Sequence, residues 1–417
     1  MGGQSKVTVA GVGMTDFGKF PDRGLKSLSQ EAVGAALKDA ALEPEDIEVA
    51  FAANSVAGLI TGQECIRGQV VLRESSIGGI PIFNVENACA SSSSAFHLAC
   101  QLISSGAYDT ALVVGFEKLT HPDKKVSLGA FSSAVDIELA KVLQEAMQKM
   151  GSRPGKDGDA KDKGASGEGG GSKSMFMDIY AAAIRMHMSE YGTTQEQIAK
   201  VCVKSHAFGA LNPHAQYREE LTLDEVLGAR VIAYPLTLPM CAPIGDGAAA
   251  AVLVSDDYAR SHAISGPQVA ASVVLSGSLP SAGTPMAEVR AGAAAYEMAG
   301  IGPDDVDVAE VHDATSAAEI LAYEDLGFCA RGEGGRLADE GATSLGGRIP
   351  VNTSGGLSSK GHPIGASGVA QICEIAWQLR GDCGARQVEG ARIGLTQNGG
   401  GFLGNDAAAQ AVHILTA

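Results

Sequence analysis

Aromatic and basic residues are both scarce in this chain of 417 residues. Aromatic side chains make up 5% of the sequence, and 31 lysines and arginines face 48 acidic residues, for a net charge of −17. This negative charge disfavours nucleic acid or an anionic membrane as a partner. An anionic ligand would need a local basic patch that works against this field.

Several sequence patterns are missing as well. No apolar run is long enough to span a membrane and the first residues lack the apolar core of a signal peptide, so we expect a cytoplasmic protein. The eight cysteines include no Cys-x-x-Cys pair and no short zinc spacing, which supports neither a disulfide framework nor a metal site. Gly11 and Gly13 lack the third glycine of a dinucleotide-binding fingerprint.

Strands and helices alternate along the front of the chain. Residues 6–13, 44–50 and 110–117 contain predicted strands, and a helix that opens at Ser27 with a capping box to Gln30 follows the first of them. This alternation predicts a mostly parallel sheet that is covered on both faces.

The most informative stretch joins a short apolar run to a helix at Cys89. Residues 82–89 are predicted as a buried strand, and one face of the helix that follows carries Ala95, Leu98, Ala99, Leu102 and Ile103. Unpaired N–H groups at a helix start stabilise a thiolate, so we expect a lowered pKa and a reactive thiol at Cys89. The alternative is that Cys89 is an inert core residue, as most free cysteines are.

The pattern of the first half recurs in the second. Residues 303–309 nearly repeat 44–50, with the same proline, acidic pair and alternation. Residues 349–352, followed by a predicted helix over 368–381, resemble the strand and helix around Cys89. Two stacked copies of one α/β unit would place corresponding turns face to face.

The segment over 121–230 has a different character. Its Gly/Lys/Asp/Ser-rich part over 151–172 predicts an exposed loop, between helices at 137–150 and 175–191. One side of the second helix carries Met175, Ile179, Ala182, Ala183 and Met186. We interpret this side as core packing, except that residues 175–177, where the loop returns, are candidates for contacting an acyl group.

Two histidines follow predicted strands of the second half. His312 comes after the run 306–311, and His362 lies in a glycine-rich turn before a helix. Ligands bind at the carboxyl ends of strands in open α/β sheets, so the repeat would bring both histidines towards Cys89. A third glycine-rich turn, over 395–401, offers amides for an oxyanion. Although a lone histidine is usually structural, the combined set indicates acyl transfer.

These motifs make the sequence similar to the thiolase superfamily, most closely to its sterol-carrier-protein-x and lipid-transfer-like members. The matching segments are 87–92, 245–249, 310–313, 361–368 and 398–401. The resemblance covers essentially the whole chain. It implies a thiolase-like duplicated α/β/α/β/α layered fold with an inserted loop domain that covers the coenzyme A and acyl site. The expected division is 1–120 plus 231–260 for the first half, 121–230 for the loop domain and 261–417 for the second half.

The resemblance also implies roles for the site residues. Cys89 would carry the acyl group as a thioester, and His362 would deprotonate it. His312 would help to form an oxyanion hole for the thioester carbonyl, and the amides of Cys89 and Gly399 would form a second. Coenzyme A is expected as a substrate, with no covalently bound cofactor and no metal. Further substrate contacts are expected from Met175, Phe176, Met177, Asn398 and Gly400.

Two positions depart from the family's pattern. Degradative thiolases carry a second, acid/base cysteine in the glycine turn, where this chain has Gln397. The sterol-carrier-protein-x type places it directly after His-Asp, where this chain has Ala314. We expect His312 to take over the proton transfer, in a Cys-His-His set like that of condensing ketosynthases.

The resemblance leaves three classes of function open. The first is cleavage of a 3-oxoacyl-CoA by coenzyme A, with a bulky, branched or aromatic acyl group held on Cys89. The second is a condensing acyltransferase or a retro-aldolase on the same scaffold, and the third is a non-catalytic lipid-binding subunit. The retention of Cys89, His312 and His362 favours the first.

The resemblance further implies partners. A homodimer is expected, and relatives of this type often work with a small zinc-ribbon/OB-fold partner subunit. Some of them, such as benzoylsuccinyl-CoA thiolase, handle bulky or aromatic acyl groups. Most lysines and arginines are merely solvated, and none is singled out for the phosphates of coenzyme A. The basic candidates in the middle segment are Lys173, Arg185, Lys204, Arg218 and Arg230.

Overall fold

The computed structural model describes residues 6–139, 175–278, 283–404 and 406–417. The predicted loop over 151–172, most of the predicted helix over 137–150, and Lys173 lie outside the described residues. Among the helices of the described ranges, none is long and apolar enough to cross a membrane.

Nine of the described strands form one sheet, in the order β3-β2-β4-β7-β1-β8-β11-β10-β9. The first half supplies β1 (Val7–Met14), β2 (Val49–Ala53), β3 (Ile82–Val85), β4 (Thr110–Glu117) and β7 (Gly247–Ser255). The second half supplies β8 (Gln268–Ser276), β9 (Val308–Glu310), β10 (Ile393–Leu403) and β11 (Asp406–Thr416). The halves join where Thr8 of β1 pairs with Gln268 of β8. The strand predicted over 349–352 is reduced to one bridge between Val351 and Ala309 of β9.

The sheet is mixed, so the prediction of a mostly parallel sheet is wrong. Strand β2 runs parallel to β3 and β4, and β9 runs parallel to β10. Strand β7 is antiparallel to both β4 and β1, and β11 is antiparallel to both β10 and β8. A connection as short as the one between β10 and β11 allows only antiparallel pairing.

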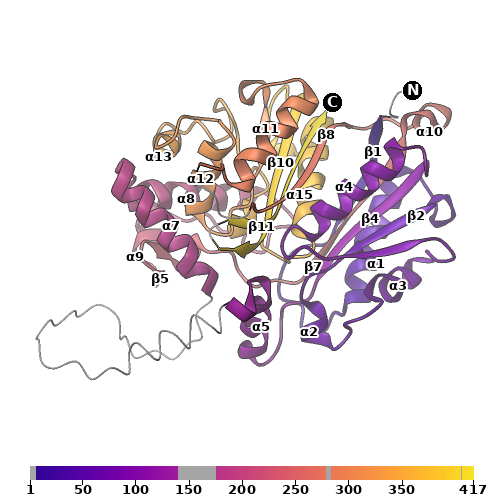
Figure 1. The fold of residues 1–417 in the computed structure, drawn as a ribbon, viewed down its shortest axis with the longest axis horizontal. Helices are drawn as coiled ribbons and strands as arrows, with labels where there is room; N and C mark the ends of the chain where they lie inside the picture. Colours follow the sequence, from indigo (N-terminus) through magenta and orange to yellow (C-terminus); the bar gives the residue numbers. More distant parts are fainter. Residues whose placement is uncertain (1–5, 140–174, 279–282, 405) are drawn as a thin grey trace, which may run out of the picture.

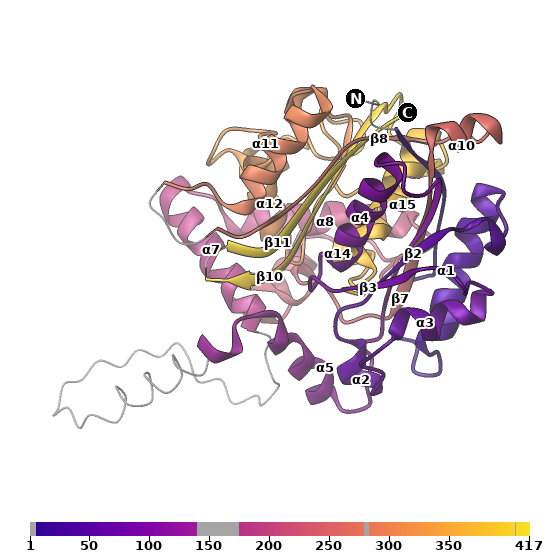
Figure 2. The same cartoon turned by 45° about the vertical axis from the view of Figure 1, so that its right-hand side comes forward.

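Two central helices lie between the two half-sheets. Helices α4 (Ser91–Ser104) and α15 (Ser367–Arg380) contact each other and strands of both halves. Helix α1 (Leu25–Ala40) covers the outer face of the first half, and α11 (Ala287–Ala299) covers that of the second. Figures 1 and 2 show this arrangement, which confirms the predicted layered fold.

The burial of each helix follows from its place in the layers. Almost every residue of α15 is buried, as expected for a helix covered on all sides, whereas α1 buries one face. Helix α1 begins at Leu25 after Gly24, which has no side-chain cap. The predicted capping box at Ser27 is therefore wrong, because Ser27 lies inside the first turn, where its Oγ donates to the carbonyl of Gly24.

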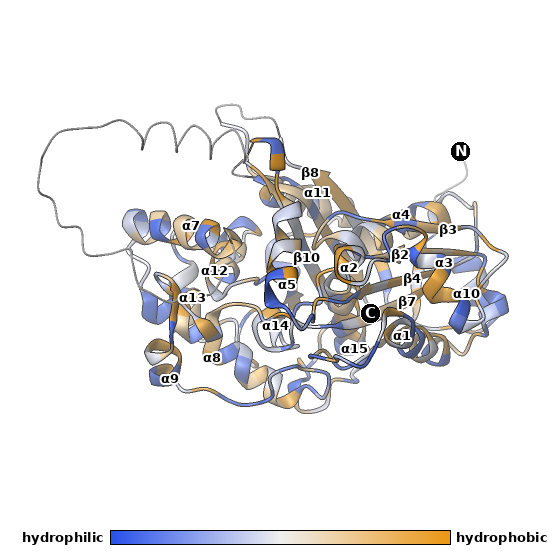
Figure 3. Ribbon diagram, turned by 90° about the horizontal axis from the view of Figure 1, so that it is seen from below, coloured by the Kyte–Doolittle hydropathy of each residue, from blue (hydrophilic) through white to orange (hydrophobic). Residues whose placement is uncertain are grey.

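The chain between β4 and β7 builds a separate group of helices. It contains α5 (Lys124–Phe131), α7 (Met175–Tyr191), α8 (Gln195–Leu211), α9 (Leu223–Gly228) and the hairpin β5 (Val231–Ala233) and β6 (Leu236–Thr237). Helix α8 packs against α12 (Ser316–Asp325), α13 (Gly334–Asp339) and α14 (Gly356–Ser359) of the second half. The other α-helices of the described ranges are α2 (Ala57–Thr61), α3 (Arg67–Leu72) and α10 (Asp256–Ser261). Hydrophobic and hydrophilic residues alternate along α7 in Figure 3.

Candidate active site

Cys89 lies in the tight connection between β3 and α4, one residue before the helix cap Ala90. Strand β3 is an edge strand and is only half-buried, so the predicted buried strand is wrong in this respect. Ala88 has a φ of 49°, a left-handed conformation that is uncommon for a residue with a side chain. Such backbone strain persists only where the surroundings enforce it, and it aims the Cys89 side chain out of the turn.

The serines that follow Cys89 fasten this turn. Ser91 Oγ accepts the N–H of Asn87 at 3.0 Å, and Ser94 Oγ accepts the side-chain amide of Asn87 at 2.8 Å. Ser92 Oγ accepts the N–H of Val369 at 3.1 Å, which ties α4 to α15. These serines are all buried. Their small, hydrogen-bonded side chains allow α4 to start deep between the two halves.

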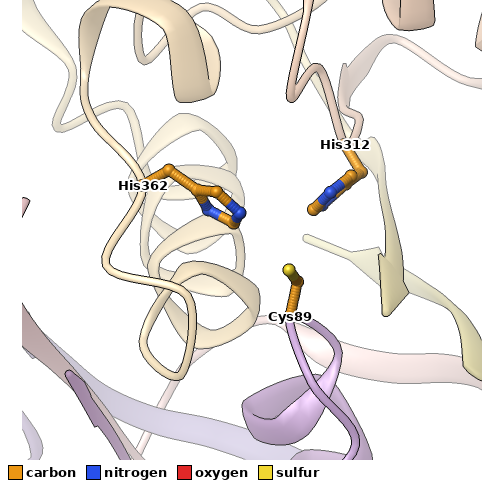
Figure 4. Close-up of side chains that lie close together, drawn as sticks. All are labelled: Cys89, His312 and His362. Atoms are coloured by element: carbon orange, nitrogen blue, oxygen red, sulfur yellow. The ribbon is translucent and has the colours of Figure 1, made fainter. Parts of the chain in front are cut away.

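The structure brings Cys89, His312 and His362 together. The imidazole rings meet edge to face with centroids 5.2 Å apart, and one donor atom from each of the three residues lies within 4.8 Å of the others. In Figure 4 the sulfur of Cys89 points towards the space between the two rings. His312 follows β9 and His362 precedes α15, so each ring stands at the carboxyl end of a strand or the start of a central helix.

Hydrogen bonds fix the proton of His362 on Nδ1. Ser367 Oγ lies 2.7 Å from Nδ1 of His362 and donates its own hydrogen to the carbonyl of Pro363 at 3.1 Å. Because a hydroxyl has one hydrogen, Ser367 accepts the N–H of the ring. The lone pair of Nε2 is then free, so His362 is the ring suited to act as a base.

The opposite tautomer is fixed at His312. Asn398 Oδ1 accepts the hydroxyl of Ser93 at 3.1 Å, so its Nδ2 faces Nδ1 of His312 at 2.9 Å and donates to it. A neutral ring that accepts at Nδ1 carries its hydrogen on Nε2. His312 therefore offers a hydrogen-bond donor at Nε2.

Both imidazoles are neutral in the resting site. Burial lowers the pKa of His312 to about 4. Burial, then the neighbouring His312 and Lys360, lower the pKa of His362 well below its usual value. Neither ring carries a charge at neutral pH.

The thiol of Cys89 is also neutral, and the expected lowered pKa is wrong. Burial raises its pKa to about 12, and the negative charge of Glu117 adds to the effect. The amides of Cys89 itself and of Gly401 act in the opposite direction. The helix start does supply N–H groups, but the loss of water and a nearby carboxylate outweigh them.

The glycines of 399–401 lie within β10 rather than in the predicted turn. Gly401 supplies the amide that reaches the sulfur of Cys89, and Gly399, the expected oxyanion donor, lines the cavity. A Cβ at Gly400 would lie 2.2 Å from the carbonyl oxygen of Asn87, so this glycine packs against the turn that carries the nucleophile. Gly400 and Asn398, expected as substrate contacts, therefore position Cys89 and His312.

The positions of the family's second cysteine hold no acid in this chain. Gln397 Oε1 accepts the backbone N–H of His312 at 2.7 Å, so its side chain positions the histidine. Ala314 lines the cavity with a methyl group.

A cavity of about 2680 Å³ opens above the three residues. Helix α7 buries Ala181, Ile184 and His187, so the side predicted to pack in the core faces outwards instead. Apolar residues on this side form one wall of the cavity: Phe176, Met177, Ile179, Ala182, Ala183 and Met186. Met175 is the first residue of α7 and is 43% exposed.

Aromatic rings gather on the α7 wall. Phe402 of β10 lies 5.8 Å from Phe176 and 5.6 Å from Tyr180, measured between ring centroids. Tyr180 is close enough to Cys89 for the sulfur to contribute, after burial, to a raised phenol pKa. The aromatic wall therefore stands next to the nucleophile.

The basic candidates of the middle segment divide into two groups. Arg218 and Arg230 line the cavity, as do Lys19, Lys124 and Lys125. Lys204 is buried in an ion pair with Glu319, and Arg185 donates to the carbonyl of Tyr234 at 2.7 Å. Lys204 is thus a structural residue.

Sequence reasoning missed Ser367, Tyr180 and Phe402, and it named Gly399 rather than Gly401 within the glycine-rich run. Ser367 had a signal in the sequence, since it lies five residues after His362 at a helix start. Tyr180 and Phe402 are brought together by the packing of α7 against β10, for which the sequence carries no local signal.

Comparison with known proteins assigns the family. Residues 7–231 match the thiolase N-terminal domain family and residues 278–416 the thiolase C-terminal domain-like family. The chain is 39% identical over 415 residues to an acetyl-CoA acetyltransferase of Methanothermobacter thermautotrophicus, covering 98% of this chain and 99% of the relative. It is 35% identical to benzoylsuccinyl-CoA thiolase subunit BbsB of Thauera aromatica, covering 95% of each.

Two further similar proteins agree with this family assignment. Human sterol carrier protein 2 is 34% identical over 407 residues, which cover 94% of this chain and 69% of that protein. A solved structure titled Ltp2-ChsH2(DUF35) aldolase shares the fold, with a TM-score of 0.76, 24% identity, and coverage of 99% of this chain and 98% of that one. The chain therefore belongs to the thiolase family, and it is an acyltransferase of that family.

Proposed function

We propose that this enzyme cleaves a 3-oxoacyl-CoA with coenzyme A through an acyl group held on Cys89. The observation that carries the proposal is the opposite proton placement on the two histidines, which gives one base and one hydrogen-bond donor around a single thiol. A thioester-forming enzyme needs both.

In the first half-reaction, His362 Nε2 takes the proton of Cys89 as the sulfur attacks the 3-oxo carbon. Ionising a thiol of pKa about 12 in the absence of substrate would cost roughly 6 kcal/mol at pH 7.5, so proton transfer accompanies the attack. The amides of Cys89 and Gly401, which reach the sulfur, would bind the adjacent oxygen that becomes negative. Nε2–H of His312 faces the thioester oxygen of the departing acyl-CoA.

His362 carries the transferred proton in both half-reactions. After the first step it is an imidazolium, and it returns this proton to the carbanion of the departing acyl-CoA. Neutral His312 is a poor acid, because losing Nε2–H would leave an anionic ring in a buried site. In the second half-reaction, His362 takes the proton of incoming coenzyme A and hands it to the sulfur of Cys89 as the thioester breaks. One imidazole then replaces the second cysteine, and His312 keeps the oxyanion role.

The acyl group is bulky or aromatic. The support is the wall of Phe176, Tyr180 and Phe402 next to Cys89. Aromatic rings stack against planar acyl groups and gain about 0.5–1.5 kcal/mol per ring pair beyond burial. Coenzyme A would enter past the basic residues Lys19, Arg218 and Arg230, which also line the cavity.

The enzyme acts as a homodimer that binds a small zinc-ribbon/OB-fold subunit. In support of the dimer, β3 lies at an open sheet edge, where Phe83 is 47% exposed and Leu98 of α4 is 42% exposed. Unpaired edge strands with apolar side chains are prone to pair with a second chain. In support of the small subunit, the Thauera relative is named as a subunit.

A retro-aldol cleavage of a 3-hydroxyacyl-CoA is the second candidate. One observation favours it: neither Gln397 nor Ala314 can serve as the second acid of a degradative thiolase. An aldol cleavage needs no acyl-enzyme, so it does not require Cys89.

Turnover assays with both substrate classes decide between the candidates. The purified chain, with and without the product of its genomic neighbour, should consume 3-oxoacyl-CoA only when coenzyme A is present. A Cys89→Ala variant should lose this activity, whereas a Cys65→Ala variant, which alters an exposed cysteine on the surface, should keep it. Full activity of Cys89→Ala would eliminate the acyl-enzyme route, and cleavage of 3-hydroxyacyl-CoA by that variant would support the aldolase.

A further inference from the structure

A buried carboxylate that forms no ion pair among the described residues lies near the nucleophile. Glu117, the last residue of β4, is fully buried. Its carboxylate accepts the backbone N–H groups of Ser55 at 3.1 Å and Gly365 at 3.0 Å, and the side-chain amide of Asn54 at 3.1 Å. These donors come from the loop after β2 and from the segment 361–366, which carries His362.

The segment 361–366 is seated directly on this carboxylate. A Cβ at Gly365 would lie 2.6 Å from the carbonyl oxygen of Phe116 and 3.0 Å from Glu117 Oε2, so only glycine allows the approach. A Cβ at Gly115 would lie 2.5 Å from the carbonyl oxygen of Gly365. The position of His362 therefore depends on a contact between two backbones and one acid.

The charges around Glu117 do not neutralise it. Lys118, the next residue, turns its ammonium to Asp246 Oδ2 at 2.9 Å. The thiol of Cys89 is near enough for the negative charge of Glu117 to raise its pKa. An isolated buried charge costs stability and is seldom retained without a purpose.

We propose that Glu117 is a positioning residue that seats the His362 segment through Gly365 and places a negative charge near Cys89 that, in addition to burial, disfavours the resting thiolate. The charge disfavours a free thiolate but does not oppose attack coupled to proton transfer, in which the thiolate never accumulates. The resting nucleophile is thereby protected from oxidation and alkylation, which both require the thiolate.

The ionisation of Glu117 should make the reactivity of Cys89 depend on pH in a recognisable way. Burial raises the pKa of Glu117 to about 7, against four backbone N–H groups that lower it. The carboxyl is therefore mostly neutral at pH 6 and mostly charged at pH 8. Because the charge itself acts on Cys89, its effect on the thiol should appear across this pH range.

The test measures the rate of Cys89 alkylation by iodoacetamide between pH 6 and pH 9, followed by mass spectrometry of the peptide that contains it. Glu117→Gln should react as fast as the wild type at pH 6. For an interaction of about one pKa unit, it should react about fivefold faster at pH 8 and almost tenfold faster at pH 9. Glu86→Gln, which removes an exposed carboxylate from the same turn, should change the rate less than twofold, because water screens that charge.

A second measurement covers the case in which Glu117→Gln does not fold. In the wild type alone, the logarithm of the alkylation rate should flatten between about pH 7 and pH 8 and rise again above it. If Glu117 is only a hydrogen-bond hub, the variant will react faster by the same factor at every pH and the wild-type profile will be straight. Either result overturns the proposal. The inference rests on Cys89 as the nucleophile of the proposed function. The alkylation rate reports on the resting thiol and not on turnover. Failure of the enzyme to cleave 3-oxoacyl-CoA and failure of the alkylation rate to depend on Glu117 are therefore separate outcomes.

Discussion

Removal of the Ser367 hydroxyl tests the assignment of His362 as the base. Ser367 is fully buried and accepts Nδ1–H of His362 at 2.7 Å, so Ser367→Ala leaves this N–H without a partner. A buried unsatisfied donor costs about 1–3 kcal/mol. The ring avoids this cost by moving its hydrogen to Nε2, where it blocks proton transfer from Cys89. Restoring the active tautomer then costs the same 1–3 kcal/mol, which corresponds to a fall of roughly 5- to 150-fold in kcat/KM.

The assay pairs thiolysis kinetics with the nitrogen chemical shifts of His362. We expect a reduced kcat with little change in KM, together with a shift pattern that moves from the Nδ1–H to the Nε2–H tautomer. Ser205→Ala on α8 is the matched control, since this serine is buried and its hydroxyl has no partner among the described residues. Wild-type kcat/KM in folded Ser367→Ala would refute the reasoning.

Three further changes probe the site and the core. Gly400→Ala forces a Cβ to 2.2 Å from the carbonyl oxygen of Asn87, so the nucleophile should move and kcat should fall about 100-fold in steady-state assays. A fully active variant would show that the turn can shift without displacing Cys89. Burial lowers the pKa of His413 to about 3, so the unfolded state binds its proton first as the pH falls below 6.5. Urea unfolding should therefore show a loss of up to roughly 2 kcal/mol between pH 6.5 and pH 5 from this residue, and His413→Gln should remove that loss; an unchanged slope would contradict the assignment. Lys204→Met leaves the buried carboxylate of Glu319 without its cationic partner and should lower the free energy of unfolding by about 3–5 kcal/mol in the same assay. A raised KM for coenzyme A at unchanged stability would instead indicate that Lys204 binds a phosphate.

The layered fold could be predicted from the sequence because the internal repeat is visible in it. The proline and acidic pair at 44–46 and 303–305 mark the same turn in each half, and both lead into strands of one continuous sheet. Strand direction was not readable. It depends on where β7 and β11 insert, and an apolar run looks the same whichever way it pairs.

The site was predictable to the level of side-chain types. Cysteine and histidine at the ends of predicted strands pointed to Cys89, His312 and His362, and the structure brings the three together. The acidity of the thiol was not predictable. It depends on burial and on Glu117, whereas the sequence shows only the helix start. The outward side of α7 was also misjudged, because an apolar stripe has the same period whether it lines a core or a cavity.

The central claim is that acyl transfer passes through the sulfur of Cys89. The most direct measurement mixes the enzyme with a 3-oxoacyl-CoA in the absence of free coenzyme A, quenches with acid and records the intact mass. We predict one adduct per chain, equal in mass to the shortened acyl group, located on the Cys89 peptide and discharged by added coenzyme A. Cleavage of the substrate with an unmodified Cys89 at every time point would contradict the account.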